Sequence, residues 1–106
     1  MSIKIGGTAT STAPKVLTTA YTILPTDVSL IVNSASAVTL TLPAASSCPG
    51  RVLFIKSVNI GGVVSATSNI APLSSLIPST AILTAILGKY ATLVSDGVQW
   101  DIMNSN

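Results

Sequence analysis

The chain has 106 residues, of which 48% are hydrophobic and only 8% are charged, whereas an ordinary soluble domain carries about 25% charged residues. This length predicts one domain, and so few charges predict an obligate oligomer, because surface charge normally opposes association. The net charge of +2 comes from five scattered Lys and Arg side chains, which form none of the basic runs typical of nucleic-acid binding.

Residues 1–14 predict a flexible N-terminal arm that precedes a single β domain over residues 15–106. Gly6-Gly7 is followed by Thr, Ser and Ala up to Pro14, without apolar periodicity, while Ile3 and Ile5 alternate with Lys4 as in a strand. Such a segment cannot bury itself, so it either adds to the sheet edge of another subunit or is a frayed terminus. We expect no signal peptide, and no membrane span in the uncharged but interrupted stretch 57–88.

Short strands then recur about every ten residues, a spacing typical of a β-sandwich or barrel. The first is predicted over 16–24, with one side made of Leu17, Thr19, Tyr21 and Ile23. The second is predicted over 28–32, where the inward side chains are Val28, Leu30 and Val32.

The stretch 38–43 organises the centre of the chain. Val38, Leu40 and Leu42 alternate with threonines, which predicts a strand with one wet face, and Pro43 ends it. Pro49-Gly50 provides a second break before the apolar strand 52–58. These two strands are expected to pair with each other, followed by a weak strand at 63–67 and a loop at 68–79.

Residues 80–88 leave two interpretations open. A helix capped by Ser79 and ended by Gly88 fits the pattern, and so does a strand with Thr80 and Thr84 on one face. The segment is apolar nearly all round, so in either case it is expected to be buried.

The C-terminal part predicts a hairpin formed by a strand over 89–95 and a strand after Asp96-Gly97. This dipeptide fits a type I′ turn, because Asp and Gly tolerate the positive φ angles at its centre. Val98, Trp100 and Ile102 are expected on one side of the second strand. Trp100 is interpreted as a core residue, with a platform for sugars as the alternative.

Little in the composition supports catalysis. There is no His, and the only carboxylates are Asp27, Asp96 and Asp101, so an activated nucleophile or a general acid–base pair lacks its partners. Asp27 and Asp96 are predicted to bind backbone amides in turns, with a calcium site as the alternative. Cys48 is the only cysteine and is interpreted as a buried or half-buried structural thiol. We therefore predict a non-enzymatic protein without catalytic residues, cofactor or metal.

Residues 21–102 resemble a small β module of tailed-phage virion structural proteins, found in tail fibres, head fibres and capsid decoration proteins. The resemblance rests on an alternating strand that ends in Leu-Pro, on a Gly-Arg strand, and on a Ser-Asp-Gly-x-x-Trp hairpin. The residues that carry it as a structural motif are Leu42, Pro43, Pro49, Gly50, Asp96, Gly97 and Trp100. The resemblance implies a small antiparallel β-sandwich or jelly-roll-like domain, commonly a homotrimer, without catalytic activity.

Fibre proteins of this kind carry the module on a longer chain with a stalk, whereas here only the arm precedes Lys15. This favours a trimeric capsid decoration, cement or head-fibre protein on the virion surface, made in the host cytoplasm. Its expected partners are further copies of itself and the major capsid protein, through residues 1–14, and neither nucleic acid nor membrane. The alternative is a tail-fibre or spike tip that binds a host receptor or glycan.

Overall fold

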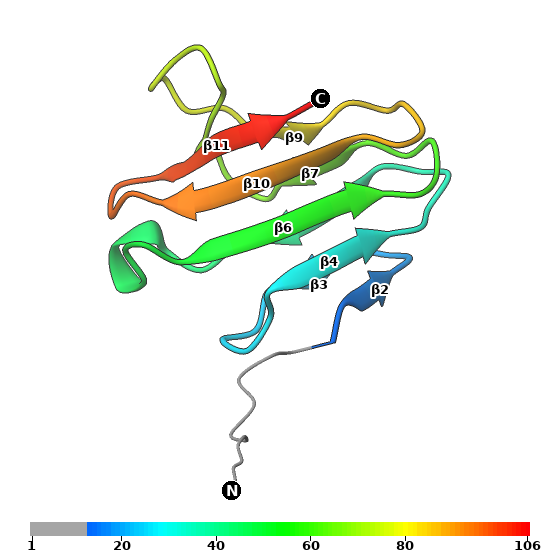
Figure 1. Ribbon diagram of the computed structural model, residues 1–106, viewed down its shortest axis with the longest axis horizontal. Coiled ribbons are helices and arrows are strands. Elements are labelled where there is room, and N and C mark those ends of the chain that lie inside the picture. The colour runs from blue at the N-terminus through cyan, green and yellow to red at the C-terminus, as the bar shows by residue number, and fades with distance from the viewer. Residues whose placement is uncertain (1–12) are drawn as a thin grey trace, which may run out of the picture.

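The computed structural model describes residues 13–106, which form an all-β protein with a single short 3-10 turn (Figure 1), as the sequence predicts. The elements are β2 (Lys15–Leu17), β3 (Tyr21–Thr22), β4 (Ser29–Val32), β5 (Val38–Thr41), η1 (Ala45–Ser47), β6 (Val52–Ser57), β7 (Val63–Ser65), β8 (Ile70–Ala71), β9 (Ala81–Leu83), β10 (Tyr90–Ser95) and β11 (Trp100–Ser105). The predicted arm, residues 1–14, lies outside the described residues apart from Ala13 and Pro14.

The strands form two mixed sheets. One has six strands in the order β2-β4-β6-β10-β11-β8, and the other has four in the order β3-β5-β7-β9. From β2 to β10 each strand lies in the other sheet from the strand before it. The strands β2, β4 and β6 are parallel to one another, as are β3, β5 and β7.

The expectation of purely antiparallel pairing is therefore wrong for much of the fold. Antiparallel pairing is found where β10 meets β6 and β11, and where β7 meets β9. The predicted pair formed by 38–43 and 52–58 is also wrong, because β5 and β6 belong to different sheets. The predicted strand over 16–24 breaks at residues 18–20, which lets β2 and β3 join different sheets.

Buried side chains from both sheets form one hydrophobic core. Its members include the predicted inward residues Leu17, Ile23, Leu30, Val32, Val38, Leu40 and Leu42. Trp100 is 0% exposed, and its indole Nε1 donates a hydrogen bond of 3.0 Å to the carbonyl oxygen of Pro43. The core interpretation of Trp100 is thus confirmed, and a fully buried indole cannot serve as a sugar platform. Val28 was expected inside but is exposed, because β4 begins one residue later.

The segments around residues 68–88 depart from the predictions in two ways. The predicted loop 68–79 contains β8, and Ile70 forms a bridge with Ser79. Within 80–88 the strand interpretation is right for β9 and the helix interpretation is wrong. The segment is not buried throughout, because Ile86 and Leu87 lie exposed beyond the end of β9.

The predicted C-terminal hairpin is confirmed, with its turn shifted by one residue. The Asp96 amide donates to the Gln99 carbonyl at 3.0 Å, so the two central residues are Gly97 and Val98 rather than Asp96 and Gly97. Gly97 has a φ of 92°, a conformation that favours glycine. Val98 is consequently 85% exposed at the tip instead of sharing the inward side with Trp100.

Candidate functional site

The outer face of the six-stranded sheet carries large apolar side chains where polar ones are usual. A sheet that packs one face on the core normally alternates apolar inward and polar outward residues. In β6, Leu53 and Ile55 point inward as expected, but the outward position between them is Phe54, which is 49% exposed. Tyr90 at the start of β10 is 44% exposed. This face therefore leaves two aromatic side chains half in water.

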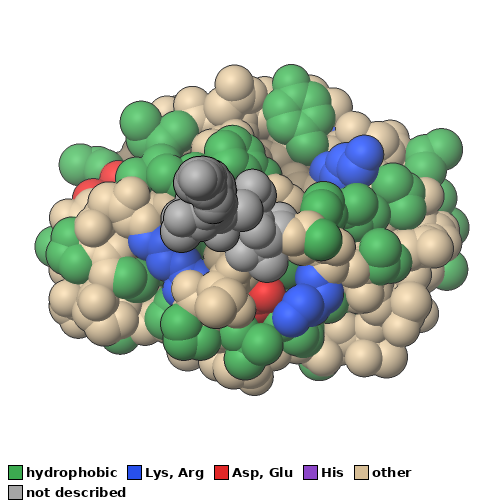
Figure 2. All heavy atoms as spheres, turned by 60° about the horizontal axis from the view of Figure 1, so that its bottom comes forward, with side chains coloured by type: hydrophobic (Ala, Val, Ile, Leu, Met, Phe, Trp, Pro, Cys, Tyr) green, Lys and Arg blue, Asp and Glu red, His purple; other side chains and the backbone are tan. Residues whose placement is uncertain are grey.

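These residues line a shallow groove of about 350 Å³ across β4, β6 and β10. Its lining consists of Pro14, Ser29, Leu30, Ile31, Phe54, Ile55, Lys56, Tyr90, Ala91 and Thr92. Among these described residues Lys56 carries the only charge, and its register partners on the neighbouring strands are Ile31 and Tyr90. Figure 2 views the molecule with the edge of β2 brought forward and shows hydrophobic side chains over this region among few charged ones. We call this surface the apolar groove.

The four-stranded sheet presents a different outer face. Its exposed strand positions include Thr22 in β3 and Thr39 and Thr41 in β5. Leu40, which lies between the last two, points into the core. Threonine hydroxyls hydrogen-bond to water without carrying charge. The exposed positions of β3 and β5 therefore carry hydroxyl groups, whereas those of β6 and β10 include the aromatic side chains of Phe54 and Tyr90.

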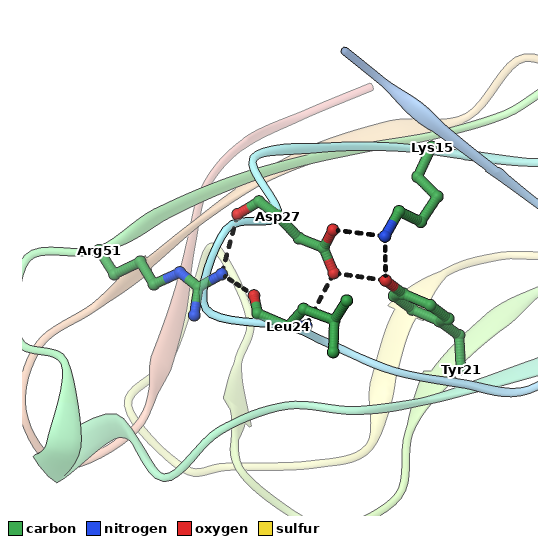
Figure 3. A network of polar contacts seen from close by, with 5 residues as sticks. All are labelled: Lys15, Tyr21, Leu24, Asp27 and Arg51. Carbon is green, nitrogen blue, oxygen red and sulfur yellow. Dashed lines mark hydrogen bonds and ion pairs between the residues drawn. The ribbon is translucent and has the colours of Figure 1, made fainter. Parts of the chain in front are cut away.

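A polar network holds the short edge strand β2 beside the apolar groove (Figure 3). The Lys15 ammonium lies 3.2 Å from Asp27 Oδ1 and donates a hydrogen bond of 2.7 Å to the Tyr21 hydroxyl. That hydroxyl donates to Asp27 Oδ2 at 2.7 Å, and the Leu24 amide donates to the same oxygen at 2.7 Å. The Asp27 carboxylate, 3% exposed, thereby joins β2, β3 and the turn before β4.

Arg51 fastens the same turn from the other side. Its guanidinium donates to the carbonyl oxygens of Leu24 and Asp27 at 2.6 Å and 2.8 Å. Burial alone would raise the pKa of Asp27, but the hydrogen bonds from Tyr21 and Leu24 and the ammonium of Lys15 outweigh it, so this pKa lies below its usual value. The hydrogen bonds to Tyr21 and Asp27 raise the pKa of Lys15. The network holds the Lys15 ammonium against the Asp27 carboxylate. It thereby fixes the start of β2 and the position of Pro14 beside the groove.

The seven residues of the predicted motif gather at the hairpin end of the fold, away from the apolar groove. Trp100 bonds to Pro43, the Gly50 amide donates to the Ser95 carbonyl at 2.7 Å, and a Cβ at Gly97 would lie 3.8 Å from Pro49. The motif residues thus join the two sheets at one end, a structural arrangement. Leu42 is buried in the same core, and Asp96 lies in the hairpin turn.

The predicted turn roles of the aspartates are confirmed. Asp96 Oδ1 accepts hydrogen bonds from the amides of Val98 and Gln99 at 2.8 Å and 2.9 Å, as Asp27 does from Leu24. Residues 13–106 contain no cluster of three or more His, Cys, Asp or Glu side chains that could hold a metal ion. Cys48 is half-buried, as predicted, with its thiol 3.6 Å from the Ala44 carbonyl oxygen.

Sequence reasoning missed the apolar groove and the burial of the Asp101 carboxylate. One carboxylate oxygen of Asp101, Oδ1, is buried without a hydrogen-bond partner. Burial, followed by the neighbouring Asp96, raises the pKa of Asp101, whereas the hydrogen bonds from the backbone amides of Gln99 and Val98 lower the pKa of Asp96. The signal for the groove was present in the sequence: Phe54 stands at the outward phase of its strand, where Thr39 and Thr41 stand in β5.

Comparison with known proteins gave no match to a protein-family model, a curated protein sequence or a solved structure. Between residues 13 and 106, no helix has the length and apolar character needed to cross a bilayer.

Proposed function

We propose that this protein is a non-enzymatic structural component of a phage virion surface, which assembles with copies of itself through the outer face of its six-stranded sheet. The observation that carries the proposal is the apolar groove, where Phe54 and Tyr90 stand half exposed on a chain with only 8% charged residues. Exposed apolar patches of this kind mark interaction surfaces. The virion setting rests on the resemblance of residues 21–102 to phage structural modules.

In this proposal the outer face of the four-stranded sheet is exposed to solvent, and the outer face of the six-stranded sheet is buried against a neighbouring subunit. The four-stranded sheet keeps Thr22, Thr39 and Thr41 in water. The six-stranded sheet packs Phe54 and Tyr90 against a neighbouring subunit. A homotrimer closed around a threefold axis would cover this face on every copy and leave the threonine face outward, where a decoration, cement or head-fibre protein meets solvent.

The chemistry of the groove supports burial against protein rather than catalysis. Aliphatic and aromatic side chains dominate its lining, with one lysine and three hydroxyl-bearing residues, Ser29, Thr92 and Tyr90. A general acid–base mechanism needs titratable groups placed against one another.

Mass in solution tests the assembly half of the proposal. Light scattering at micromolar concentration should give a homo-oligomer, and Phe54→Asp should reduce its mass, because a carboxylate cannot be buried unpaired in an apolar contact. Thr39→Asp is the matched control, since it adds the same charge to the outer face of the other sheet and should leave the mass unchanged. A wild-type monomer would overturn the self-assembly proposal.

The virion half is tested on purified particles. An antibody against the chain should label particles made by the phage that encodes it, on their outer surface. Particles that lack the chain, prepared under conditions that retain their other surface proteins, would contradict a structural role in the virion.

A second candidate, a fibre or spike tip that binds a host protein, is favoured by one further feature. The loop between β8 and the bridge at Ser79 exposes Leu73, Leu76 and Ile77. Gln99 Nε2 donates to the Leu76 carbonyl at 2.9 Å and ties this loop to the C-terminal hairpin. Loss of host-surface binding in Leu76→Ser/Ile77→Ser, with unchanged oligomer mass, would support this function over decoration.

A further inference from the structure

We propose that residues 1–12 of a second copy occupy the apolar groove, with Ile3 and Ile5 packed against the half-exposed faces of Phe54 and Tyr90. The inference rests on the proposed function, since it requires self-assembly, and it names the segment that covers the groove. Three observations carry it: the place where the described chain begins, the chemistry of the two surfaces, and the direction of the chain at Pro14.

The described chain begins at the edge of the groove. Lys15 pairs with Leu30, so Pro14 stands beside Ser29, and both residues belong to the groove lining. Twelve further residues precede Ala13. Extended, they span roughly 40 Å, whereas three adjacent strands span only about 10 Å at a spacing near 4.8 Å. The segment is therefore long enough to cross the full width of such a groove.

The chemistry of residues 1–12 complements that of the groove. In an extended segment Ile3 and Ile5 point to one side, about 6.7 Å apart, while Lys4 points to the other. The two isoleucines would meet aromatic and aliphatic surface, and Lys4 would stay in water. Residues 1–12 contain no acidic side chain, so the contact buries no carboxylate.

The geometry at Pro14 favours the groove of a neighbour over the chain's own. A residue before proline is biased toward extended backbone, which applies to Ala13. Lys15 is held by Asp27 and Tyr21, so the direction of β2 is fixed on the other side of Pro14. The chain at residues 13–15 therefore runs along β2 at the edge of its own groove, and residues 1–12 would have to turn onto the sheet face to fill that groove.

This arrangement also explains how the assembly closes. The donor is residues 1–12 and the acceptor is the sheet face, so each contact joins two different surfaces. Such head-to-tail contacts form a closed ring when the rotation between subunits allows it, as in a trimer. Each subunit then gives one segment and receives one.

Disulfide trapping in the full-length chain tests the placement. In a Cys48→Ser background, Ile5→Cys combined with Lys56→Cys should give disulfide-linked chains on a denaturing gel after mild oxidation. The matched control pairs Ile5→Cys with Thr39→Cys, which lies on the outer face of the other sheet, and should give at least tenfold less linked product. Links found only within one chain, or equal linking in both pairs, would overturn the inference.

A charge variant of the segment separates this inference from the proposed function. Full-length Ile3→Asp/Ile5→Asp should raise the concentration at which the oligomer dissociates by at least tenfold. Thr39→Asp/Thr41→Asp, which adds the same charge to the outer face of the four-stranded sheet, should leave it nearly unchanged. If the wild type is oligomeric and the isoleucine variant is equally so, the segment does not fill the groove and self-assembly still stands. If the wild type is a monomer, both proposals fail.

Discussion

Replacing Trp100 by Phe tests how the two sheets are joined. The indole is 0% exposed and donates to the Pro43 carbonyl at 3.0 Å, which links β11 of one sheet to the chain just after β5 of the other. Phenylalanine keeps an aromatic ring in the core but has no donor. Leaving the carbonyl without its partner costs about 1–3 kcal/mol. The smaller ring leaves a cavity of roughly 40 Å³, which costs about 1 kcal/mol more.

The free energy of unfolding should therefore fall by about 2–4 kcal/mol in Trp100→Phe. Chemical denaturation followed by far-ultraviolet circular dichroism measures this change, because Trp100 is the only tryptophan and its fluorescence is lost in the variant. All samples need the same protein concentration, since assembly makes stability concentration-dependent. Thr39→Ala, on an exposed strand face, should change the free energy by less than about 0.5 kcal/mol. A loss below about 1 kcal/mol in Trp100→Phe would refute both the hydrogen bond and the packing argument.

Three other substitutions test the polar and steric features of the fold. The depressed pKa of Asp27 means that its contribution to stability is complete above the unfolded-state pKa, about 3.9, and is lost as pH falls through the lower folded-state pKa. Asp27→Asn should therefore be less stable at pH 7 and lose less stability in acid, as measured by denaturation at both pH values. The pKa of Asp101 is raised, so pH affects stability in the opposite direction. The folded state disfavours the ionised carboxylate and loses stability as pH rises through the folded-state pKa. Asp101→Asn should raise the melting temperature at pH 7, and a lower value would contradict the burial argument. A Cβ at Gly61 would overlap the carbonyl oxygens of Ser34 and Ser36, so Gly61→Ala should cost about 3 kcal/mol in chemical denaturation.

The sequence predicted which side chains face the core because that pattern is local. Val38, Leu40 and Leu42 alternate with threonines, and alternation places them on one face whichever strand lies alongside. Alternation says nothing about the partner strand. The strands 38–43 and 52–58 read as neighbours because they are consecutive, and consecutive strands usually pair. Here the connection through η1 crosses to the other sheet, and both strands find parallel partners instead.

The polar network was not predictable, because its members meet only in the folded chain. Lys15, Tyr21 and Asp27 stand six residues apart in sequence, and Arg51 lies 24 residues beyond Asp27, just before β6. Asp27 was correctly expected to bind a local amide, since that contact needs only the turn itself. Its burial, its lysine partner and its depressed pKa depend on how β2 and β3 separate into different sheets.

The path of the chain explains why the outer faces of the two sheets differ in their exposed side chains. Outward positions in β3 and β5 are held by Thr22, Thr39 and Thr41, and those in the intervening β4 and β6 include Ile31 and Phe54. Because successive strands enter opposite sheets, Thr22, Thr39 and Thr41 lie on the outer face of one sheet and Ile31 and Phe54 on that of the other, although Val64 in β7 and Thr92 in β10 depart from this division. An assembly that covered the apolar groove would leave the hydroxyls of these three threonines facing water.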